Sequence, residues 1–256
     1  MLPEQRKREI LSIIKQEGAI SVAQLCEMFD ISTTTVRKDL AELEQRGLII
    51  RSHGGALALN YGRSDEVSIE HRKSLLAIEK EYIANAASEY VRPGQAIYLD
   101  GSSTVISLAK KIVGIEPLTV VTNSLNVMNE LAEAKGIKII SLGGVLDHLS
   151  RCFIGPDVEE NLSKLRVDGA FISTKGISVE DGLSDAQLPE ARLHRKVLQI
   201  TNKAYLLMDS SKFDLVCFAV VADLEQVDYL ITDKAPPQHF RQALKQANVD
   251  LIVTNN

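Results

Sequence analysis

Residues 21–57 read SVAQLCEMFDISTTTVRKDLAELEQRGLIIRSHGGAL, and this stretch predicts two short helices followed by a β-hairpin. Ser21 and Ser32 are suitable N-caps for the two helices, and Gly47 ends the second one. Each helix carries apolar residues at helical spacing on one face. They are Val22, Leu25, Cys26 and Phe29 on the first helix, and Val36, Leu40 and Leu43 on the second. With the short turn at Asp30-Ile31 between them, the pair is typical of a helix-turn-helix.

A further helix is predicted over 4–17, and two β-prone runs around Gly54-Gly55 predict the wing of a winged helix. In a helix-turn-helix the second helix enters the major groove with its N-terminal residues toward the bases. Hydroxyls there can bind phosphates or base edges, and Arg can bind guanine with two hydrogen bonds. The expected DNA-binding residues are Ser21, Ser32, Thr33, Thr34, Thr35, Arg37, Lys38, Arg51 and His53.

Periodicity alone also fits a small helical domain that binds nothing and uses its threonines as caps. DNA binding is favoured over this alternative, because the segment resembles the N-terminal domain of DeoR-type bacterial transcriptional regulators. Their pattern of an Arg and two aliphatic residues at four-residue steps is matched by Arg6, Ile10 and Ile14. The second part of the pattern is matched by Ser32 and Thr35-Val-Arg-Lys-Asp-Leu40, and the wing by Arg51-Ser-His-Gly-Gly-Ala56.

The composition of the 256 residues, 45% hydrophobic and 25% charged, excludes disordered, collagen-like and disulfide-rich classes. The net charge of −5 belongs to residues 61–256, because residues 1–60 hold eight Lys+Arg and eight Asp+Glu. Positioned cations are therefore needed to bind DNA, and non-specific binding is expected to be weak. No signal peptide or apolar run of membrane-spanning length is found, and three unpaired cysteines suit a reducing compartment, so a cytoplasmic bacterial protein is expected.

Residues 58–74 are polar and aperiodic, which predicts a linker between a DNA-binding domain at 1–57 and a larger domain at 75–256. After a helix over 75–90, short aliphatic strands alternate with amphipathic helices, the pattern of a mostly parallel sheet covered on both faces. The predicted strands are 96–99, 119–121, 138–142, 170–173, 204–208, 229–231 and 250–253. The predicted helices are 105–112, 124–131, 189–200 and 237–247.

Small and polar residues follow five of these strands, and ligands of open α/β sheets bind outside the carboxyl ends of the strands. The stretch Asp100–Thr104 opens a helix whose N-terminus suits a phosphate, and lysines supply countercharge. Turn and cap residues of any α/β protein would look similar in one loop, but five such loops favour a polyol-phosphate site. The expected effector-binding residues are Lys80, Asp100, Gly101, Ser102, Ser103, Thr104, Thr122, Asn123, Gly143, Gly144, Lys175, Asp185, Glu190, Asp209 and Lys212.

This half also resembles the sensor domain of DeoR-type regulators, a fold similar to ribose-5-phosphate isomerase. The resemblance implies effector contacts at Lys80, Asp209, Lys212 and the loop after the first strand. The Ile231-Thr-Asp233 stretch is among the residues that match the family in this half. The chain departs from the family at His194-Arg195, where a Lys-Arg pair is usual. A histidine there would make effector binding depend on pH near 6–7.

Three functions are weighed. The first is a repressor of a sugar-catabolism operon that binds operator DNA as a dimer or tetramer and is released by a phosphorylated sugar. The linker and the helix over 75–90 are expected to couple the two sites. The second is a sugar-phosphate isomerase or deaminase with an accessory domain, and the third is a DNA-binding protein whose large domain only oligomerises. No cofactor, metal or membrane partner is expected, since Walker, GxGxxG and metal-ligand spacings are missing.

Overall fold

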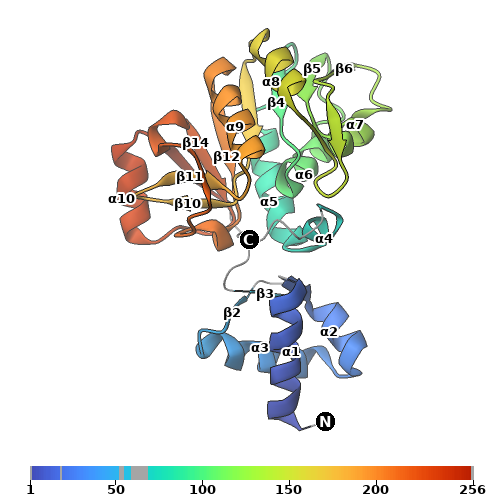
Figure 1. The fold of residues 1–256 in the computed structure, drawn as a ribbon, viewed down its shortest axis with the longest axis vertical. Helices are drawn as coiled ribbons and strands as arrows, with labels where there is room; N and C mark the ends of the chain where they lie inside the picture. The colour runs from blue at the N-terminus through green and yellow to red at the C-terminus, as the bar shows by residue number, and fades with distance from the viewer. Residues whose placement is uncertain (1, 18, 52–54, 59–68, 255–256) are drawn as a thin grey trace. The chain divides into compact units, whose positions relative to one another are not determined.

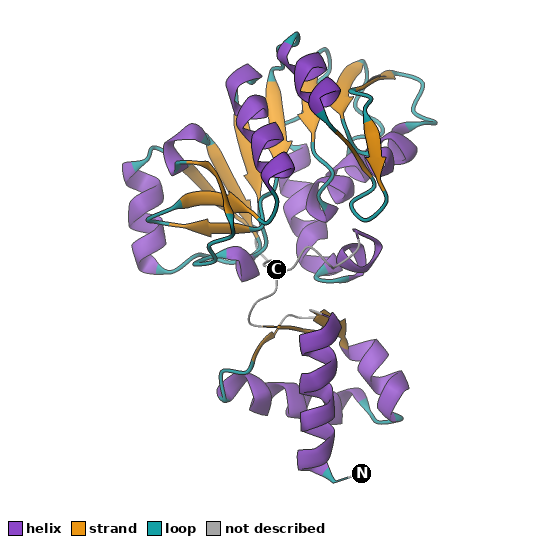
Figure 2. Cartoon of the chain, viewed as in Figure 1, coloured by secondary structure: helices purple, strands orange, loops and turns teal. Residues whose placement is uncertain are grey.

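The computed structural model describes residues 2–17, 19–51, 55–58 and 69–254. The chain divides into two compact units, Met1–Glu79 and Lys80–Asn256. Both are drawn in Figure 1, and Figure 2 shows that the first is mainly helical whereas the second is built on a sheet. No helix of the described residues is long and apolar enough to cross a membrane.

The first unit is a winged helix-turn-helix. Its elements are α1 (Pro3–Glu17), β1 (Ala19–Ser21), α2 (Val22–Phe29), α3 (Thr33–Gln45), β2 (Ile49–Arg51), β3 (Gly55–Ala58) and α4 (Ile69–Ser74). Both predicted caps are confirmed, because Ser21 caps α2 and Ser32 caps α3. Ile10, Leu25 and Leu40 are buried together between the three main helices and the small sheet. Burial of these apolar faces is what holds three short helices together.

The wing differs from the predicted hairpin by one strand. Its sheet has the order β1-β3-β2, so that β3 pairs with both β2 and β1 in antiparallel register. A Cβ on Gly55 would lie 2.1 Å from the carbonyl oxygen of Ile20, so this close approach of β3 to β1 requires glycine. A three-residue strand such as β1 has too few alternating residues to be recognised in a sequence.

The predicted linker contains a helix. Residues 59–68 lie outside the described residues, and 69–74 form α4, which has a buried Ile69 but only six residues to show a periodicity. The helix predicted over 75–90 is α5 (Ala77–Ser88), and the division between the two compact units falls within it, after Glu79. The compact units thus divide five residues later than the predicted boundary at 74/75.

The second unit contains a seven-stranded sheet of order β15-β14-β12-β9-β4-β5-β6, in which every neighbouring pair is parallel. Its strands are β4 (Ala96–Leu99), β5 (Leu118–Thr122), β6 (Ile137–Ser141), β9 (Gly169–Ile172), β12 (Ala204–Leu207), β14 (Tyr229–Thr232) and β15 (Asp250–Val253). All seven predicted strands are confirmed. The chain winds outward from β4 in one direction through β5 and β6, and from β9 in the other direction. The border between β4 and β9 is therefore a topological switch point, where loops diverge and ligands bind in open α/β sheets.

Helices cover this sheet. They are α6 (Ser103–Lys111), α7 (Leu125–Leu131), α8 (Pro156–Ser163), α9 (Leu188–Ile200) and α10 (Gln238–Gln246). Helix α6 packs on α7, and α8 packs on α9, the two pairs visible in Figure 1. The main core, which includes Tyr98, Ile172 and Val197, lies between these helices and the sheet.

Two smaller sheets were not predicted. The antiparallel hairpin of β7 (Val145–Asp147) and β8 (Cys152–Ile154) is one of them. The other has the order β10-β11-β13, from β10 (Gly176–Ser178), β11 (Gly182–Asp185) and β13 (Ala219–Ala222). Apart from β8 and β13, these short strands contain Gly, Ser or Asp rather than a continuous aliphatic run, so the sequence gives little signal for them. The short 3₁₀ helices η1 (Ser210–Lys212) and η2 (Leu224–Gln226) flank β13 in the chain.

Candidate functional site

The N-terminus of α3 presents hydroxyls and cations to solvent. The Ser32 hydroxyl accepts a hydrogen bond from the Thr35 backbone N–H at 3.3 Å and lies 3.0 Å from the Thr35 hydroxyl. Thr33 and Thr34 are exposed, whereas Val36 on the opposite face is buried. The capping pair therefore holds the first turn of α3, and Thr33 and Thr34 remain at its surface.

Ser21 has a different role. Its hydroxyl accepts from the Gln24 backbone N–H at 3.2 Å, and the Gln24 side-chain oxygen accepts from the Ser21 backbone N–H at 3.0 Å. The two residues form a capping box that fixes the start of α2. Because its hydroxyl is also 2.8 Å from the Gln24 side-chain oxygen, Ser21 is engaged locally at the start of the first helix of the motif.

Ion pairs inside the first unit occupy several of its cations. Arg6 on α1 bonds both carboxylate oxygens of Asp39 on α3, at 2.6 and 3.2 Å, and Asp39 is only 3% exposed. Lys7, also buried, bonds Glu4 and Glu42, and this contact holds the pKa of Glu42 below its usual value. These pairs lock α1 against α3. The matches of Arg6 and Asp39 to the family pattern are therefore structural.

The remaining cations divide into paired and unpaired ones. Arg46 pairs with Glu4 at 3.2 Å, and Arg51 on β2 pairs with Glu44 at 3.7 Å. Arg37 and Lys38 are exposed on α3, and neither has an ion pair with another residue that the structure describes. The surface of α3 thus offers two cations directly to an anionic partner. His53, predicted on the wing, lies outside the described residues.

At the carboxyl ends of the parallel strands, Asp100 spans the switch point between β4 and β9. One of its carboxylate oxygens accepts from the Ser102 backbone N–H at 2.8 Å, and the other accepts from the Ser173 backbone N–H at 2.6 Å. Ser102 in turn caps α6 by accepting from the Val105 N–H at 3.2 Å. Asp100, which is 3% exposed, therefore holds two strand-end loops together.

His194 on α9 lies between two carboxylates. Its Nδ1 is 2.7 Å from Asp185 and its Nε2 is 3.4 Å from Asp100. Burial acts to lower the pKa of His194, but the two carboxylates outweigh it and raise the pKa to about 10. The expected titration near pH 6–7 is therefore wrong, because the imidazole stays protonated through the neutral range.

Two lysines act on groups next to this cluster. The other oxygen of Asp185 accepts from the backbone N–H of half-buried Lys175 at 3.1 Å. Burial raises the pKa of Cys217, whereas the positive charges of Lys212 and Lys175 act to lower it. Lys175, Lys212 and Asp185 therefore all act electrostatically on the thiol of Cys217. Lys212 is 9% exposed.

The loop after β5 packs under the α6 N-terminus. The Thr122 hydroxyl donates to the Leu99 carbonyl at 2.7 Å, and Asn123 accepts from the Tyr98 hydroxyl at 3.1 Å. A Cβ on Gly101 would meet the Cys152 sulfur at 2.0 Å, so glycine is required where β8 approaches this loop. Thr122 and Asn123, two of the expected effector-binding residues, are buried and make these internal hydrogen bonds.

The predicted residues that remain are spread around the same end of the sheet. Glu190, in the first turn of α9, acts electrostatically on the buried thiol of Cys152. Gly143 and Gly144, which follow Leu142 after the end of β6, both have positive φ angles, 68° and 103°. The Asp209 carboxylate accepts from the Ser211 N–H at 3.1 Å. Lys80 is 3% exposed on α5.

Two site residues were missed. Asp233 accepts from the Ser210 backbone N–H at 2.6 Å, and burial raises the pKa of Asp233. Ser173 contributes a backbone N–H to Asp100. The Asp233 position follows a predicted strand and could have been found by the same rule that found Asp209. A backbone donor such as Ser173 leaves no signal in the sequence, because every residue type except proline has that N–H.

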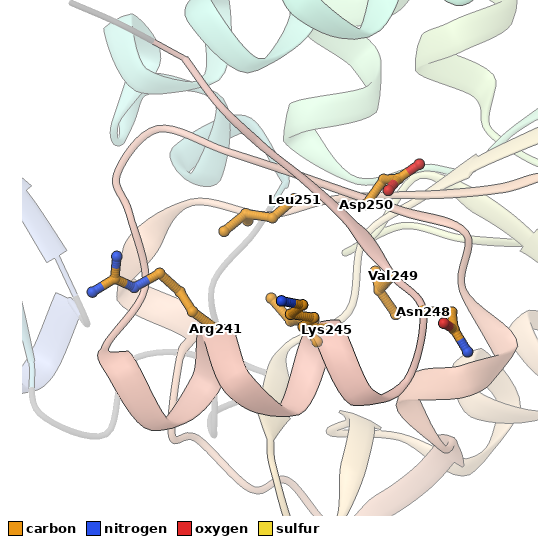
Figure 3. A pocket seen from close by; sticks show the side chains of 7 residues that line it. Arg241, Lys245, Asn248, Val249, Asp250 and Leu251 are labelled. Atoms are coloured by element: carbon orange, nitrogen blue, oxygen red, sulfur yellow. The ribbon is translucent and has the colours of Figure 1, made fainter.

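A separate pocket lies at the opposite end of the strands. Figure 3 shows it between the C-terminal part of α10 and the first residues of β15, with Arg241, Lys245 and Asp250 at its wall. It is therefore distinct from the strand-end rim. Among the described residues, no group of three His, Cys, Asp or Glu side chains is arranged to hold a metal ion.

Comparisons with known proteins agree with this division. Residues 6–61 match the DeoR-like helix-turn-helix domain, and residues 77–234 match the DeoR C-terminal sensor domain. The fold and its two sites define a transcriptional regulator with a DNA-binding unit and a sensor unit. The chain belongs to the DeoR family of such regulators.

Relatives align over nearly the whole chain. A putative aga operon transcriptional repressor of Escherichia coli O157:H7 is 32% identical, covering 97% of this chain and 93% of the relative. The transcriptional repressor GlcR of Bacillus subtilis is 35% identical, with 99% and 97% covered. The glycerol-3-phosphate regulon repressor of Escherichia coli K12 is 31% identical, with 98% and 99% covered.

Solved structures share the architecture at low identity. A translation initiation factor eIF-2B of Pyrococcus horikoshii covers 90% of this chain and 82% of its own, with 12% identity and a TM-score of 0.50. Ribose-5-phosphate isomerases are also structural neighbours, and one in complex with phospho-erythronic acid covers 52% of each chain, with 15% identity and a TM-score of 0.39.

Proposed function

We propose that this regulator represses a sugar-catabolism operon by binding its operator through α3, and that a phosphorylated sugar bound at the strand-end rim releases it. The single observation that carries the DNA half is the exposed pair Arg37 and Lys38 on α3, beside Thr33 and Thr34. The other cations near it are used in ion pairs with Asp39, Glu4 and Glu44. Base readout therefore rests on a small set of side chains at the helix N-terminus.

The test of the DNA half is Arg37→Ala, with Arg8→Ala as the matched control. Arg8 is an exposed cation on α1, so its removal changes the net charge equally without touching α3. Arg37→Ala is expected to weaken operator binding by about 1–3 kcal/mol if Arg37 reads a base. Fluorescence anisotropy with operator and scrambled duplexes measures this. Equal operator affinities for the two variants would sink the assignment of Arg37.

The effector half is supported by the chemistry of the rim. The α6 N-terminus, with Ser102, Ser103 and Thr104, offers backbone N–H groups and hydroxyls of the kind that bind phosphate. Lys175 and Lys212 add positive charge around Cys217, and Asp209 lies two residues before Ser211 in the same loop as Lys212. In this arrangement the phosphate is bound at the α6 N-terminus, and the hydroxyls of the polyol face the loops that carry acidic residues such as Asp209. The name of one relative, the glycerol-3-phosphate regulon repressor, contains a polyol phosphate of this kind.

A phosphosugar panel tests this half. Thermal shifts are measured for aldose, ketose, deoxysugar and amino-sugar phosphates, each paired with its unphosphorylated form. A ligand at about 100 times its dissociation constant stabilises the protein by about 2.7 kcal/mol. Lys212→Ala is expected to abolish the shift and the release from operator, whereas Lys245→Ala, on α10 beside the separate pocket, leaves both intact. If no phosphorylated sugar changes melting or operator affinity, the large unit serves only to oligomerise.

We expect the sensor to bind without turnover and to act as a dimer or tetramer. Asp100 and Asp185, the acidic groups nearest the switch point, already accept hydrogen bonds from backbone N–H groups and an ion pair from His194. A dimer suits DNA because operator symmetry mirrors protein symmetry. Conversion of any sugar phosphate that Asp209→Asn abolishes would show an enzyme instead, and a monomeric mass in sedimentation would contradict the dimer.

A further inference from the structure

His194 joins two sheets of the sensor unit. Asp100, its partner on one side, directly follows β4 of the seven-stranded sheet, and Asp185, its partner on the other side, ends β11 of the three-stranded sheet. His194 itself is on α9 and 7% exposed. The end of β4 therefore meets β11 and α9, which lie far from it in the chain, at one imidazole.

Each carboxylate also holds a second segment. Asp100 binds the backbone N–H of Ser102, the N-cap of α6, and that of Ser173 after β9. Asp185 binds the backbone N–H of Lys175. A continuous path of hydrogen bonds and ion pairs therefore runs from the α6 N-cap through Asp100, His194 and Asp185 to Lys175. The two ends of this path are groups of the proposed effector site: the α6 N-terminus, to which the phosphate is assigned, and Lys175.

The charges explain why an imidazole suits the position. Two carboxylates that are 3% and 1% exposed repel each other and lose most of their hydration, so they need a cation between them. With protonated His194 the cluster carries one net negative charge, and both ring N–H groups are directed at carboxylates. The ring is rigid, so it fixes the separation of Asp100 and Asp185 as well as their charge.

We propose, resting on the proposed effector site, that His194 is the positioning residue of that site: it ties the loop after β4 to β11 and so sets the spacing between the α6 N-terminus and Lys175. The ligand class that this spacing selects is a phosphate monoester carrying a polyol. Inorganic phosphate needs only one end of the path, whereas a sugar phosphate must be matched by both ends.

The experiment compares four full-length proteins: the unchanged chain, His194→Gln, His194→Lys, and the double variant Asp185→Asn/His194→Gln. His194→Gln leaves two carboxylates without a cation, and His194→Lys supplies a cation again. The double variant keeps one net negative charge, as in the unchanged chain, but lacks the imidazole. It also covers the case in which His194→Gln does not fold. Dissociation constants are measured by calorimetry for inorganic phosphate and for the sugar phosphate that gives the largest shift in the panel.

Two results are expected. The folded single and double Gln variants bind the sugar phosphate at least tenfold more weakly, with a smaller loss for inorganic phosphate, and His194→Lys binds more tightly than His194→Gln. In ¹⁵N spectra of the unchanged chain, both imidazole nitrogens of His194 carry protons at pH 8. Sugar-phosphate binding within twofold of the unchanged chain in the double variant would overturn the proposal, as would equal affinities of the Lys and Gln variants. An unchanged chain that binds no phosphate at all would refute the effector site itself.

Discussion

The protonation of His194 predicts how the stability of the sensor unit depends on pH. An unfolded histidine has a pKa near 6.5, whereas the two carboxylates raise that of folded His194 to about 10. A raised folded pKa contributes stability that is fully present below the unfolded pKa and is lost as the pH rises through the folded pKa. Stability is therefore expected to fall across pH 6.5–10 as the pH increases.

The magnitude follows from one proton. Between pH 7.5 and 9 the unfolded ring is neutral and the folded ring is charged, so the free energy of unfolding falls by about 1.4 kcal/mol per pH unit, or about 2 kcal/mol over this range. The thiols of Cys152 and Cys217 are buried with raised pKa values, and their loss of protons on unfolding acts in the same direction. The contribution of His194 is therefore the difference between the unchanged chain and the double variant Asp185→Asn/His194→Gln.

Tyrosine fluorescence in urea is a suitable assay. The chain has no tryptophan, and five of its six tyrosines lie in the sensor unit, so the emission reports mainly that unit. Urea titrations at pH 7.5, 8.0, 8.5 and 9.0 give the free energy of unfolding at each pH. The unchanged chain is expected to lose about 2 kcal/mol more than the double variant. Parallel pH profiles in the two proteins would refute the buried imidazolium.

Three further substitutions test contacts of the two units. Asp39→Ala leaves Arg6 without its buried partner and is expected to lower the free energy of unfolding by about 3–5 kcal/mol, measured in urea by circular dichroism. Replacing Asp39 by Leu and Arg6 by Met together should restore most of that loss, and an Asp39→Ala variant as stable as the unchanged chain would contradict this reasoning. Gly55→Ala forces β3 away from β1, so it should lower the free energy of unfolding by about 1–3 kcal/mol and weaken operator binding. An unchanged melting temperature would contradict this prediction. Gly101→Ala is expected to abolish effector binding because its Cβ meets the Cys152 sulfur, and the added Cys152→Ala change should restore it; failure of the second change to help would disprove the steric cause.

Much of the fold followed from local patterns. The Ser32 cap and the Val36, Leu40 and Leu43 stripe predicted α3, and the seven aliphatic runs predicted every strand of the parallel sheet. These patterns are strong because a helix face requires apolar residues at a period of about 3.6 residues and a strand buried on both faces requires a continuous apolar run. The short strands of the two smaller sheets, and β1 in the wing, have no such redundancy. They form because tertiary neighbours complete their hydrogen bonds.

The site residues divide in the same way. Asp100, Lys175, Asp209 and Lys212 were singled out because polar residues after parallel strands share one end of the sheet, whereas Asp185 ends β11, a strand that the sequence did not predict. Their roles were not determined by this rule. Whether a carboxylate is directed to a ligand or to a backbone N–H depends on the relative positions of loops, and some of these loops are far apart in the chain.

The sequence by itself determined that a helix-turn-helix precedes an α/β sensor, and that its eight cations and eight acids cancel in residues 1–60. The tertiary structure decided how those charges are used: Arg6 and Lys7 lock α1 to α3, which leaves Arg37 and Lys38 exposed. It also decided the state of His194, because two carboxylates from different sheets raise the pKa of an imidazole that would otherwise titrate near neutrality. The protonation state of a side chain depends on its burial and on its distance from other charges. Folding determines both, because it brings together residues that are far apart in the sequence.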